Sequence, residues 1–326
     1  MPDQFPADPD ALADVVRGVF PRSSSVEVSP AADRRVVVVY RVVVDGVRYY
    51  LRLAEEPGQN LTTDALVLER LRALGVRVPE AVAAEPATTA FPRSWLLMTE
   101  VPGRSLAEGG TDDEATDDEA TQAAIAAGRD VATINSVPVA GFGWVRRDGD
   151  ERLTGELNSY GQFVTSYLPE PWPGQLSGLF HENQLDALHA IAKDERDRPL
   201  RGGYLAHGDL DVTHIYTHAG RYSGIIDFGE MRGTDPYFDL GHFMLHDGET
   251  RRARLFDSFL KGYLEVSSPP HGYREAIRSS AILLGLRQLS FWLTPERGLS
   301  IGAPLVRRRA AELSNLLAGK PAHRER

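Results

Sequence analysis

The chain has 326 residues, of which 42% are hydrophobic and 25% charged, a balance typical of globular proteins rather than disordered or fibrous ones. It contains no cysteine, which excludes disulfides, thiolate metal sites and a cysteine nucleophile. The formal net charge of −10 disfavours nucleic-acid binding, because an acidic surface repels polyanions, and it mildly favours cationic small molecules.

The first hundred residues carry strand and helix signals in turn. Residues 35–53 hold two β-branched and aromatic runs around an Asp-Gly pair, which predicts a β-hairpin. Residues 62–74 have apolar side chains at helical spacing, with threonines to cap the start and a glycine after the end. Residues 94–103 then indicate a short strand that ends at Pro-Gly. This part predicts a small α+β lobe.

The character changes after residue 103. Residues 109–121 hold an acidic, imperfect duplication of TDDEA, which is typical of a solvated loop. A β-rich stretch, residues 204–228, is embedded among helical patterns. Those patterns predict helices over 117–135, 182–195, 250–265, 272–292 and 302–318. The second part therefore predicts a larger, mainly helical lobe.

Two acidic turns within the β-rich stretch carry the chemistry. Residues 207–214 read HGDLDVTH, and residues 225–230 read IIDFGE, with Asp227 eighteen positions after Asp209. Two acids on neighbouring turns can converge on one site. Phosphoryl transfer needs one carboxylate to accept the proton of the attacking hydroxyl, and other ligands to hold Mg²⁺. Because Mg²⁺ keeps several waters, one carboxylate and a weak second ligand suffice.

These segments, with GTDP at 233–236 and Asp239-Leu240, resemble the motifs of the aminoglycoside and antibiotic phosphotransferases, which share a protein-kinase-like fold with choline kinases. The resemblance extends over roughly residues 25–300. It implies an α+β, bilobal protein-kinase-like fold. The small β-rich N-lobe, residues 1–102, would hold the nucleotide-binding sheet and one helix. The mainly helical C-lobe, residues 103–326, would hold the catalytic loop, metal site and substrate pocket.

The resemblance also implies roles for the polar residues of the two acidic turns. Asp209 is the expected catalytic base, and His207 is expected to support the backbone of its loop. Asp227 is the expected Mg²⁺ ligand. His214 occupies the position of the second metal ligand, where most of the family has Asn and where macrolide and 2''-aminoglycoside kinases share the histidine. Imidazole is a softer ligand than Mg²⁺ prefers.

In the first lobe the resemblance implies a nucleotide site. Arg52 is expected to contact the α- and β-phosphates and to pair with an acid on the helix, which is Asp64 by register, with Glu69 as the alternative. Glu100 and Val101 would face the adenine or guanine through backbone groups. The phosphate-covering loop near residues 29–35 has no glycine, so Ser29 or the Arg34-Arg35 pair would have to contribute.

Several other residues near the motifs are candidates for the acceptor site. Asp211 would project near the acceptor, and Glu230 would face either the waters of the metal or the substrate. Trp292 lies on a late helix, where aromatic residues more often belong to the core, but the family places substrate contacts on such helices.

The remaining polar residues of this region are expected to be structural. Asp235 and Asp239 are expected to hold the loop and the helix start together. His242 and His246 share a helix face, but Phe243 stands where an H-E-x-x-H zinc motif needs glutamate, which favours simple packing.

The sequence thus predicts a Mg²⁺-dependent kinase that transfers the γ-phosphate of ATP or GTP to a hydroxyl of an antibiotic-like or metabolite acceptor, cationic ones included. The alternative is a catalytically weak, nucleotide-binding pseudokinase with a regulatory role. Protein-kinase activity is disfavoured, because only nine residues separate Gly229 from Asp239. With no signal peptide or membrane-length apolar run, we expect a cytoplasmic monomer or homodimer that binds neither membrane nor nucleic acid.

Overall fold

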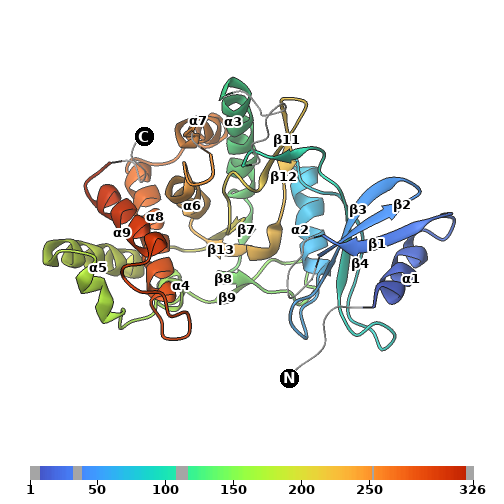
Figure 1. Ribbon diagram of the computed structural model, residues 1–326, viewed down its shortest axis with the longest axis horizontal. Coiled ribbons are helices and arrows are strands. Elements are labelled where there is room, and N and C mark those ends of the chain that lie inside the picture. The colour runs from blue at the N-terminus through green and yellow to red at the C-terminus, as the bar shows by residue number, and fades with distance from the viewer. Residues whose placement is uncertain (1–7, 32–38, 108–116, 252, 321–326) are drawn as a thin grey trace. The chain divides into compact units, whose positions relative to one another are not determined.

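The computed structural model describes residues 8–31, 39–107, 117–251 and 253–320. The chain forms two compact units, each described by itself (Figure 1). The first unit comprises residues 1–102, 146–152 and 224–226, and the second comprises residues 103–145, 153–223 and 227–326. The first is built around a β-sheet and the second is mainly helical, which confirms the predicted α+β class.

The first unit contains an antiparallel five-stranded sheet in the order β1-β2-β3-β5-β4. Its strands are β1 (Val26–Pro30), β2 (Val39–Val44), β3 (Val47–Leu53), β4 (Ala81–Glu85) and β5 (Trp95–Thr99). The predicted hairpin is formed by β2 and β3. Asp45 and Gly46 turn the chain between them with φ of 48° and 83°, the left-handed pair of a tight hairpin turn.

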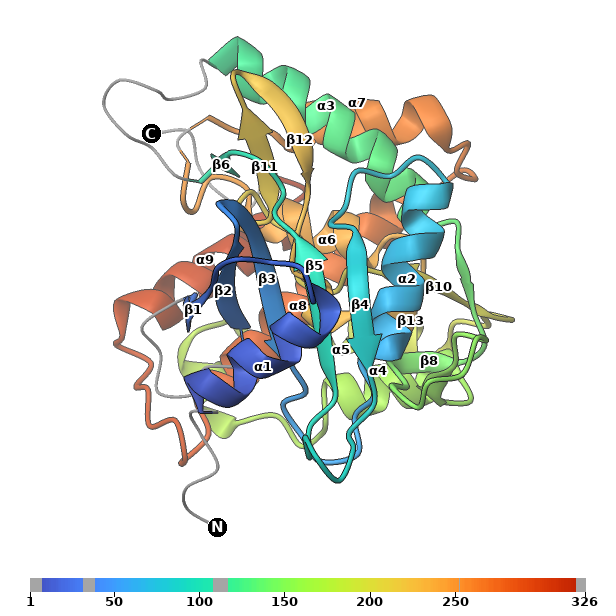
Figure 2. The ribbon, with the colours of Figure 1, turned by 90° about the vertical axis from the view of Figure 1, so that its right-hand side faces the viewer.

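Two helices cover opposite faces of this sheet (Figure 2). Leu12 and Val16 of α1 (Pro9–Val19) pack against one face, where alternate residues of β2 and β3 are buried. Because side chains alternate along a strand, Arg52 between two buried leucines points to the other face. That face meets α2 (Thr62–Ala73), whose Asp64 bonds Arg52.

The second unit contains two small sheets. A five-stranded sheet has the order β7-β10-β13-β8-β9, and a three-stranded sheet has the order β12-β11-β6. The strands of the first are β7 (Pro138–Val139), β8 (Phe142–Val145), β9 (Gly155–Leu157), β10 (Gly203–Ala206) and β13 (Arg232–Thr234); those of the second are β6 (Arg104–Ser105), β11 (Ile215–His218) and β12 (Arg221–Ile225). The loop from β10 to β11 carries HGDLDVTH.

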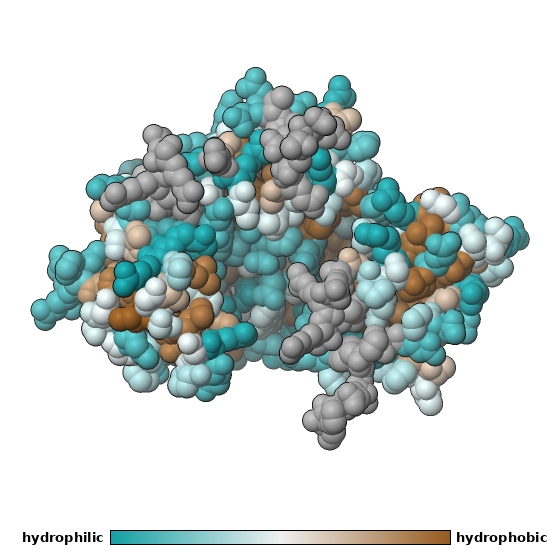
Figure 3. All heavy atoms as spheres, in the orientation of Figure 1, coloured by the Kyte–Doolittle hydropathy of each residue, from teal (hydrophilic) through white to brown (hydrophobic). Residues whose placement is uncertain are grey.

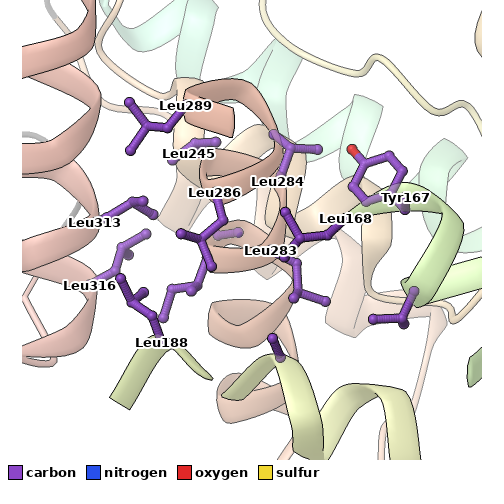
Figure 4. Packing of buried hydrophobic residues seen from close by; sticks show 14 of the residues in the cluster. Tyr167, Leu168, Leu188, Leu245, Leu283, Leu284, Leu286, Leu289, Leu313 and Leu316 are labelled. Carbon is purple, nitrogen blue, oxygen red and sulfur yellow. The ribbon is translucent and has the colours of Figure 1, made fainter. Parts of the chain in front are cut away.

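In the second unit, α8 (Tyr273–Trp292) packs against α5, α6 and α9, and its leucines lie in the core between them, whereas α3 packs against α7. Figure 4 shows Leu313 and Leu316 on one side of α8 and Tyr167 and Leu168 on the other. The helices are α3 (Asp117–Ile134), α4 (Tyr160–Tyr167), α5 (Glu182–Asp197), α6 (Phe238–His246), α7 (Phe256–Val266), α8 (Tyr273–Trp292) and α9 (Pro304–Leu317). Among the described helices, none is apolar over a stretch long enough to cross a bilayer.

The helix predicted over 250–265 begins six residues later than expected. The carboxylate of Asp247 accepts hydrogen bonds from the backbone N–H groups of Leu255 (2.8 Å) and Phe256 (3.1 Å). These donors would otherwise have no partner at the start of α7. The aspartate therefore fixes where the helix begins, and the apolar periodicity alone does not reveal it.

Candidate functional site

The loop that carries Asp209 is anchored by one buried carboxylate. Asp239, in the first turn of α6, accepts the backbone N–H groups of His207 and Gly208, both at 2.9 Å. The side-chain amide of Asn135 also donates to Asp239, at 2.8 Å. Asp239 is fully buried, so these charge-assisted bonds hold the loop tightly. Its predicted structural role is confirmed.

Gly208 allows the loop to pass close to the neighbouring turn. Its φ of +92° lies in the left-handed region, and a Cβ at this position would lie 1.9 Å from the carbonyl oxygen of Glu230. A side chain here meets both backbone strain and a hard collision. The glycine therefore fixes how the Asp209 loop meets the turn that follows Asp227.

Asp209 presents a half-exposed carboxylate, with 50% of the side chain accessible. Its Oδ1 lies 3.1 Å from Nε2 of His242 on α6. Burial raises the pKa of the Asp209 carboxyl, but the hydrogen bond from His242 and the nearby histidines outweigh burial and lower it to about 2. The carboxylate is therefore ionised at neutral pH, and within the described residues its Oδ2 accepts no hydrogen bond.

His207 packs beneath this carboxylate and is fully buried. Its Nδ1 accepts the backbone N–H of Asp209 at 3.4 Å. The ring contacts Phe228 edge-on at 4.8 Å and lies 5.4 Å from the ring of His214. The histidine thus supports the backbone on which Asp209 sits.

His214 and Asp227 approach each other beside the loop. Nε2 of His214 lies 3.9 Å from Oδ2 of Asp227, whose side chain is 62% accessible. Asp227 adopts a left-handed φ of 65°, an uncommon conformation, two residues after the end of β12. The two residues predicted as metal ligands are therefore neighbours in the second unit.

The spacing of this pair is compatible with Mg²⁺. Two atoms bound to one octahedral Mg²⁺ are about 3.0 Å apart when adjacent and about 4.2 Å apart when opposite. In the described part of the chain, no three His, Asp or Glu side chains converge on a metal position. The donor set fits an ion that takes one carboxylate and one imidazole from the protein and completes its shell with waters and phosphate oxygens.

In the first unit, Arg52 pairs with Asp64. NH1 of Arg52 lies 3.3 Å from Oδ1 of Asp64, and Glu69, the alternative partner, is exposed. Arg147 also binds Asp64, through Nε to Oδ2 at 2.8 Å and NH2 to Oδ1 at 3.2 Å. Asp64 is only 2% accessible, so two guanidinium groups neutralise one buried carboxylate.

Glu100 and Val101 directly follow β5. The Glu100 side chain is engaged by Arg48, with 3.1 Å between Nε and Oε2, and Val101 is buried. Both residues lie just beyond Tyr49–Thr99, the last pair at this end of the β3–β5 ladder.

The three candidate acceptor residues have different surroundings. Asp211 bonds within its own loop, because Oδ1 accepts the N–H of Thr213 at 2.7 Å. Oε2 of Glu230 lies 2.5 Å from NH2 of Arg232, and the Glu230 side chain is half exposed. Trp292 packs against the helical core, whereas its neighbour Phe291 is 46% exposed. Figure 3 shows brown hydrophobic residues gathered over α9 and the segment before it.

Sequence reasoning missed two residues. The sequence pattern favours packing for His242, yet it lies three positions after Asp239, so both side chains share the helix face that meets the Asp209 loop. That register is the signal that identifies it. Arg147 carries no such signal, because its partner lies 83 positions away. Arg34, Arg35 and most of the acidic duplication lie outside the described residues, while Ser29 lies in β1.

Comparison with protein families identifies the class. The sequence matches the model of the phosphotransferase enzyme family, APH, over residues 27–276. The match spans most of the chain, so the protein belongs to this family, as the resemblance implied. A search of curated proteins found no significant match.

Solved structures share the fold. Aminoglycoside phosphotransferase APH(4)-Ia is 16% identical, with a TM-score of 0.65 over 95% of this chain and 98% of the other. A thermostable mutant of that enzyme, in ternary complex with ADP and hygromycin B, is 16% identical, with a TM-score of 0.61 over 94% and 98% of the two chains. The GDP and kanamycin complex of APH(2")-IIia is 18% identical, with a TM-score of 0.57 over 94% and 98%. The predicted protein-kinase-like fold is confirmed.

Proposed function

We propose that this protein is a small-molecule kinase that transfers the γ-phosphate of ATP or GTP to an acceptor hydroxyl, with Asp209 as the base. The observation that carries the proposal is the state of the Asp209 carboxylate. It is ionised, half exposed and held through Oδ1, with Oδ2 open, on a loop anchored by Asp239. The His214–Asp227 pair lies within the same unit.

In the proposed reaction, the acceptor hydroxyl donates a hydrogen bond to Oδ2 of Asp209. The hydroxyl oxygen forms a bond to the γ-phosphorus, and the bond from that phosphorus to the β-bridging oxygen breaks. The bonding electrons leave with the nucleoside diphosphate, and the hydroxyl proton passes to Asp209. Because the transition state of such transfers is loose, positioning and charge stabilisation supply most of the rate gain.

Asp227 and His214 would hold Mg²⁺. The ion would neutralise the charge on the β- and γ-phosphate oxygens. Their donor atoms lie 3.9 Å apart, between the separations of adjacent and opposite Mg²⁺ ligands, so a small shift of either side chain would complete the pair. Asp227 supplies the hard oxygen ligand, and His214 supplies the weaker one.

The N-lobe, residues 1–102, would bind the nucleotide, and the C-lobe, residues 103–326, would supply the catalytic loop and the acceptor pocket. Arg52, oriented by Asp64, would contact the α- and β-phosphates. Backbone groups of Glu100 and Val101 would bind the base. ADP and GDP complexes of similar proteins support either donor.

The acceptor would be an antibiotic-like molecule or a metabolite. Similar proteins crystallised with hygromycin B and kanamycin, and the net charge of −10 suits a cationic acceptor. Asp211, Glu230 and Trp292 are the candidate contacts, of which Glu230 is the most exposed charged one. We expect the reaction in the cytoplasm, by a monomer or homodimer.

The test combines binding and transfer. Thermal shifts with Mg-ATP and Mg-GTP report nucleotide binding, and mass spectrometry of hygromycin B, kanamycin, choline and homoserine reports phosphorylation. We expect binding of at least one nucleotide and phosphorylation of at least one acceptor, both dependent on Mg²⁺. Binding without transfer across a broad panel would favour the regulatory pseudokinase, and an absence of nucleotide binding would contradict both.

A further inference from the structure

His242 faces two hydrogen-bond acceptors at once. Its Nδ1 lies 2.9 Å from the carbonyl oxygen of Leu210, which has no proton to give, so Nδ1 must carry a hydrogen. Its Nε2 lies 3.1 Å from Oδ1 of Asp209, which is ionised. A hydrogen bond there requires a proton on Nε2 as well. These two contacts are the ones that an imidazole with a proton on each nitrogen would make.

The neighbouring histidine, His246, carries a proton on only one ring nitrogen. Nδ1 of His246 lies 2.9 Å from the carbonyl oxygen of His242 and must donate, while its Nε2 lies 3.1 Å from the amide nitrogen of Gln288 and must accept. Burial lowers the pKa of His246 well below its usual value, and the charges of His242 and Arg309 act in the same direction. The stacked pair, 4.3 Å between ring centroids, thus holds one positive charge, on the ring next to Asp209.

The His242 ring is rigidly held. His242 is 4% accessible and sits on the helix whose Asp239 anchors the backbone of the same loop. Among the described residues, the polar groups in contact with it are the Asp209 carboxylate and the Leu210 carbonyl from the loop and His246 from its own helix. Gln288 of α8 bonds His246, and the charge of Arg309 on α9 helps to lower the pKa of His246.

We propose that His242 is a positioning residue for the transfer reaction: its imidazolium holds Oδ1 of Asp209 and so aims Oδ2 at the acceptor hydroxyl. This inference rests on the proposed function, in which Asp209 is the base. A half-exposed carboxylate on its own would rotate between orientations. One charge-assisted bond to a buried ring restricts this rotation. Oδ1 then binds His242, and Oδ2 faces the acceptor hydroxyl.

The protonation state is tested without any acceptor. Long-range ¹H–¹⁵N NMR of the histidine rings of the full chain reports protons on each ring nitrogen, and the variant His242→Gln assigns the signal. We expect both ring nitrogens of His242 to be protonated at pH 7 in the wild type, and only one in Asp209→Asn. A singly protonated His242 ring in the wild type overturns the proposal.

The positioning role is tested on the acceptor that the panel identifies. His242→Gln keeps an N–H donor near Asp209, whereas His242→Phe keeps ring volume but no donor. We expect kcat to fall about 10-fold to 100-fold in the phenylalanine variant, less in the glutamine variant, with the KM for nucleotide little changed. The control His189→Gln changes an exposed histidine that stacks on Trp172, and should retain wild-type kcat.

These measurements separate the two claims. Folded His242 variants with wild-type kcat overturn the positioning role and leave the proposed function standing. The other outcome is a wild type that binds nucleotide and shows a doubly protonated His242 ring, yet phosphorylates no acceptor. That result overturns the proposed function and with it the positioning role, and only the ion pair between His242 and Asp209 remains. A circular-dichroism melt of each variant establishes that a loss of kcat does not come from unfolding.

Discussion

Arg147 holds both carboxylate oxygens of Asp64, at 2.8 Å through Nε and 3.2 Å through NH2. The arginine is 8% accessible and the aspartate 2%. Arg52 bonds the same carboxylate. The orientation of Arg52 therefore depends on Arg147, which lies 95 positions further along the chain. The segment 146–152 belongs to the first unit, and this ion pair ties it to α2.

Replacing Arg147 should destabilise the first unit strongly. In Arg147→Ala the buried Asp64 keeps, of its contacts within the described residues, the longer one to Arg52, and breaking such a buried pair costs about 3–5 kcal/mol. Urea unfolding measures the loss. The control Arg17→Ala removes an exposed pair with Asp14 and should cost less than about 1 kcal/mol. Equal losses in the two variants would contradict the importance of the buried pair.

Gly208 should tolerate no side chain. Gly208→Ala places a Cβ 1.9 Å from the Glu230 carbonyl oxygen, so the loop must shift and Asp209 with it. Gly46→Ala has a similar φ of +83° but meets no atom within 4 Å, so it should cost only about 1–2 kcal/mol of backbone strain. Chemical denaturation compares the two, and a Gly208→Ala protein as stable as Gly46→Ala would contradict the packing described.

Asp239→Asn should loosen the Asp209 loop. The amide offers one acceptor oxygen in place of two and turns an NH₂ group toward the N–H of His207 or Gly208, so we expect a loss of about 3 kcal/mol. Hydrogen exchange at these two amides should become faster. Asp186→Asn, an exposed change of the same chemistry, is the control. Unchanged exchange in Asp239→Asn would show that the carboxylate does not hold the loop.

Glu195 should make the folded state less stable as the pH rises. Burial raises the pKa of Glu195 to about 7, although Arg198 opposes this and Asp235 adds to it. The unfolded value is 4.5. Between these pH values the folded state binds more protons, so the contribution of Glu195 is fully present below about 4.5 and lost as the pH rises through about 7.

The variant Glu195→Gln removes this titration. The slope of the unfolding free energy between pH 5 and 7 should become less negative by up to about 1.4 kcal/mol per pH unit. Glu312, whose pKa burial also raises to about 7, retains its own part of the slope in both proteins. Urea unfolding across this range measures the difference, with the exposed Glu296→Gln as control. An identical slope in Glu195→Gln and the wild type would contradict the raised pKa.

Local sequence patterns predicted the secondary-structure elements that are determined by residues close together in the sequence. The Asp45-Gly46 turn fixed the hairpin, because few residue pairs accept two positive φ angles. Apolar periodicity located α3, α5, α8 and α9 to within a few residues. The start of α7 was wrong, because the capping carboxylate of Asp247 lies outside the helix and eight residues before the first N–H it binds.

The site was predictable where motif residues are close in sequence, and not where tertiary contacts decide. The motif singled out Asp209, His214 and Asp227, and the structure has the last two as neighbours. The contact of His242 with Asp209 depends on how α6 packs against the loop, because the two residues are 33 positions apart in the sequence. The spacing of His242 from Asp239 places both on one helix face, but the sequence does not show that this face meets the Asp209 loop, so the pattern alone favours packing.

The most direct test of the central claim is a single-turnover measurement of phosphate transfer by the wild type and by Asp209→Asn, with Mg-nucleotide and the acceptor found in the panel. The account predicts that nucleotide affinity is retained, while the transfer rate falls about 10²-fold to 10⁴-fold, the usual contribution of a positioned general base. Transfer by Asp209→Asn at the wild-type rate would contradict the assignment of Asp209 as the base.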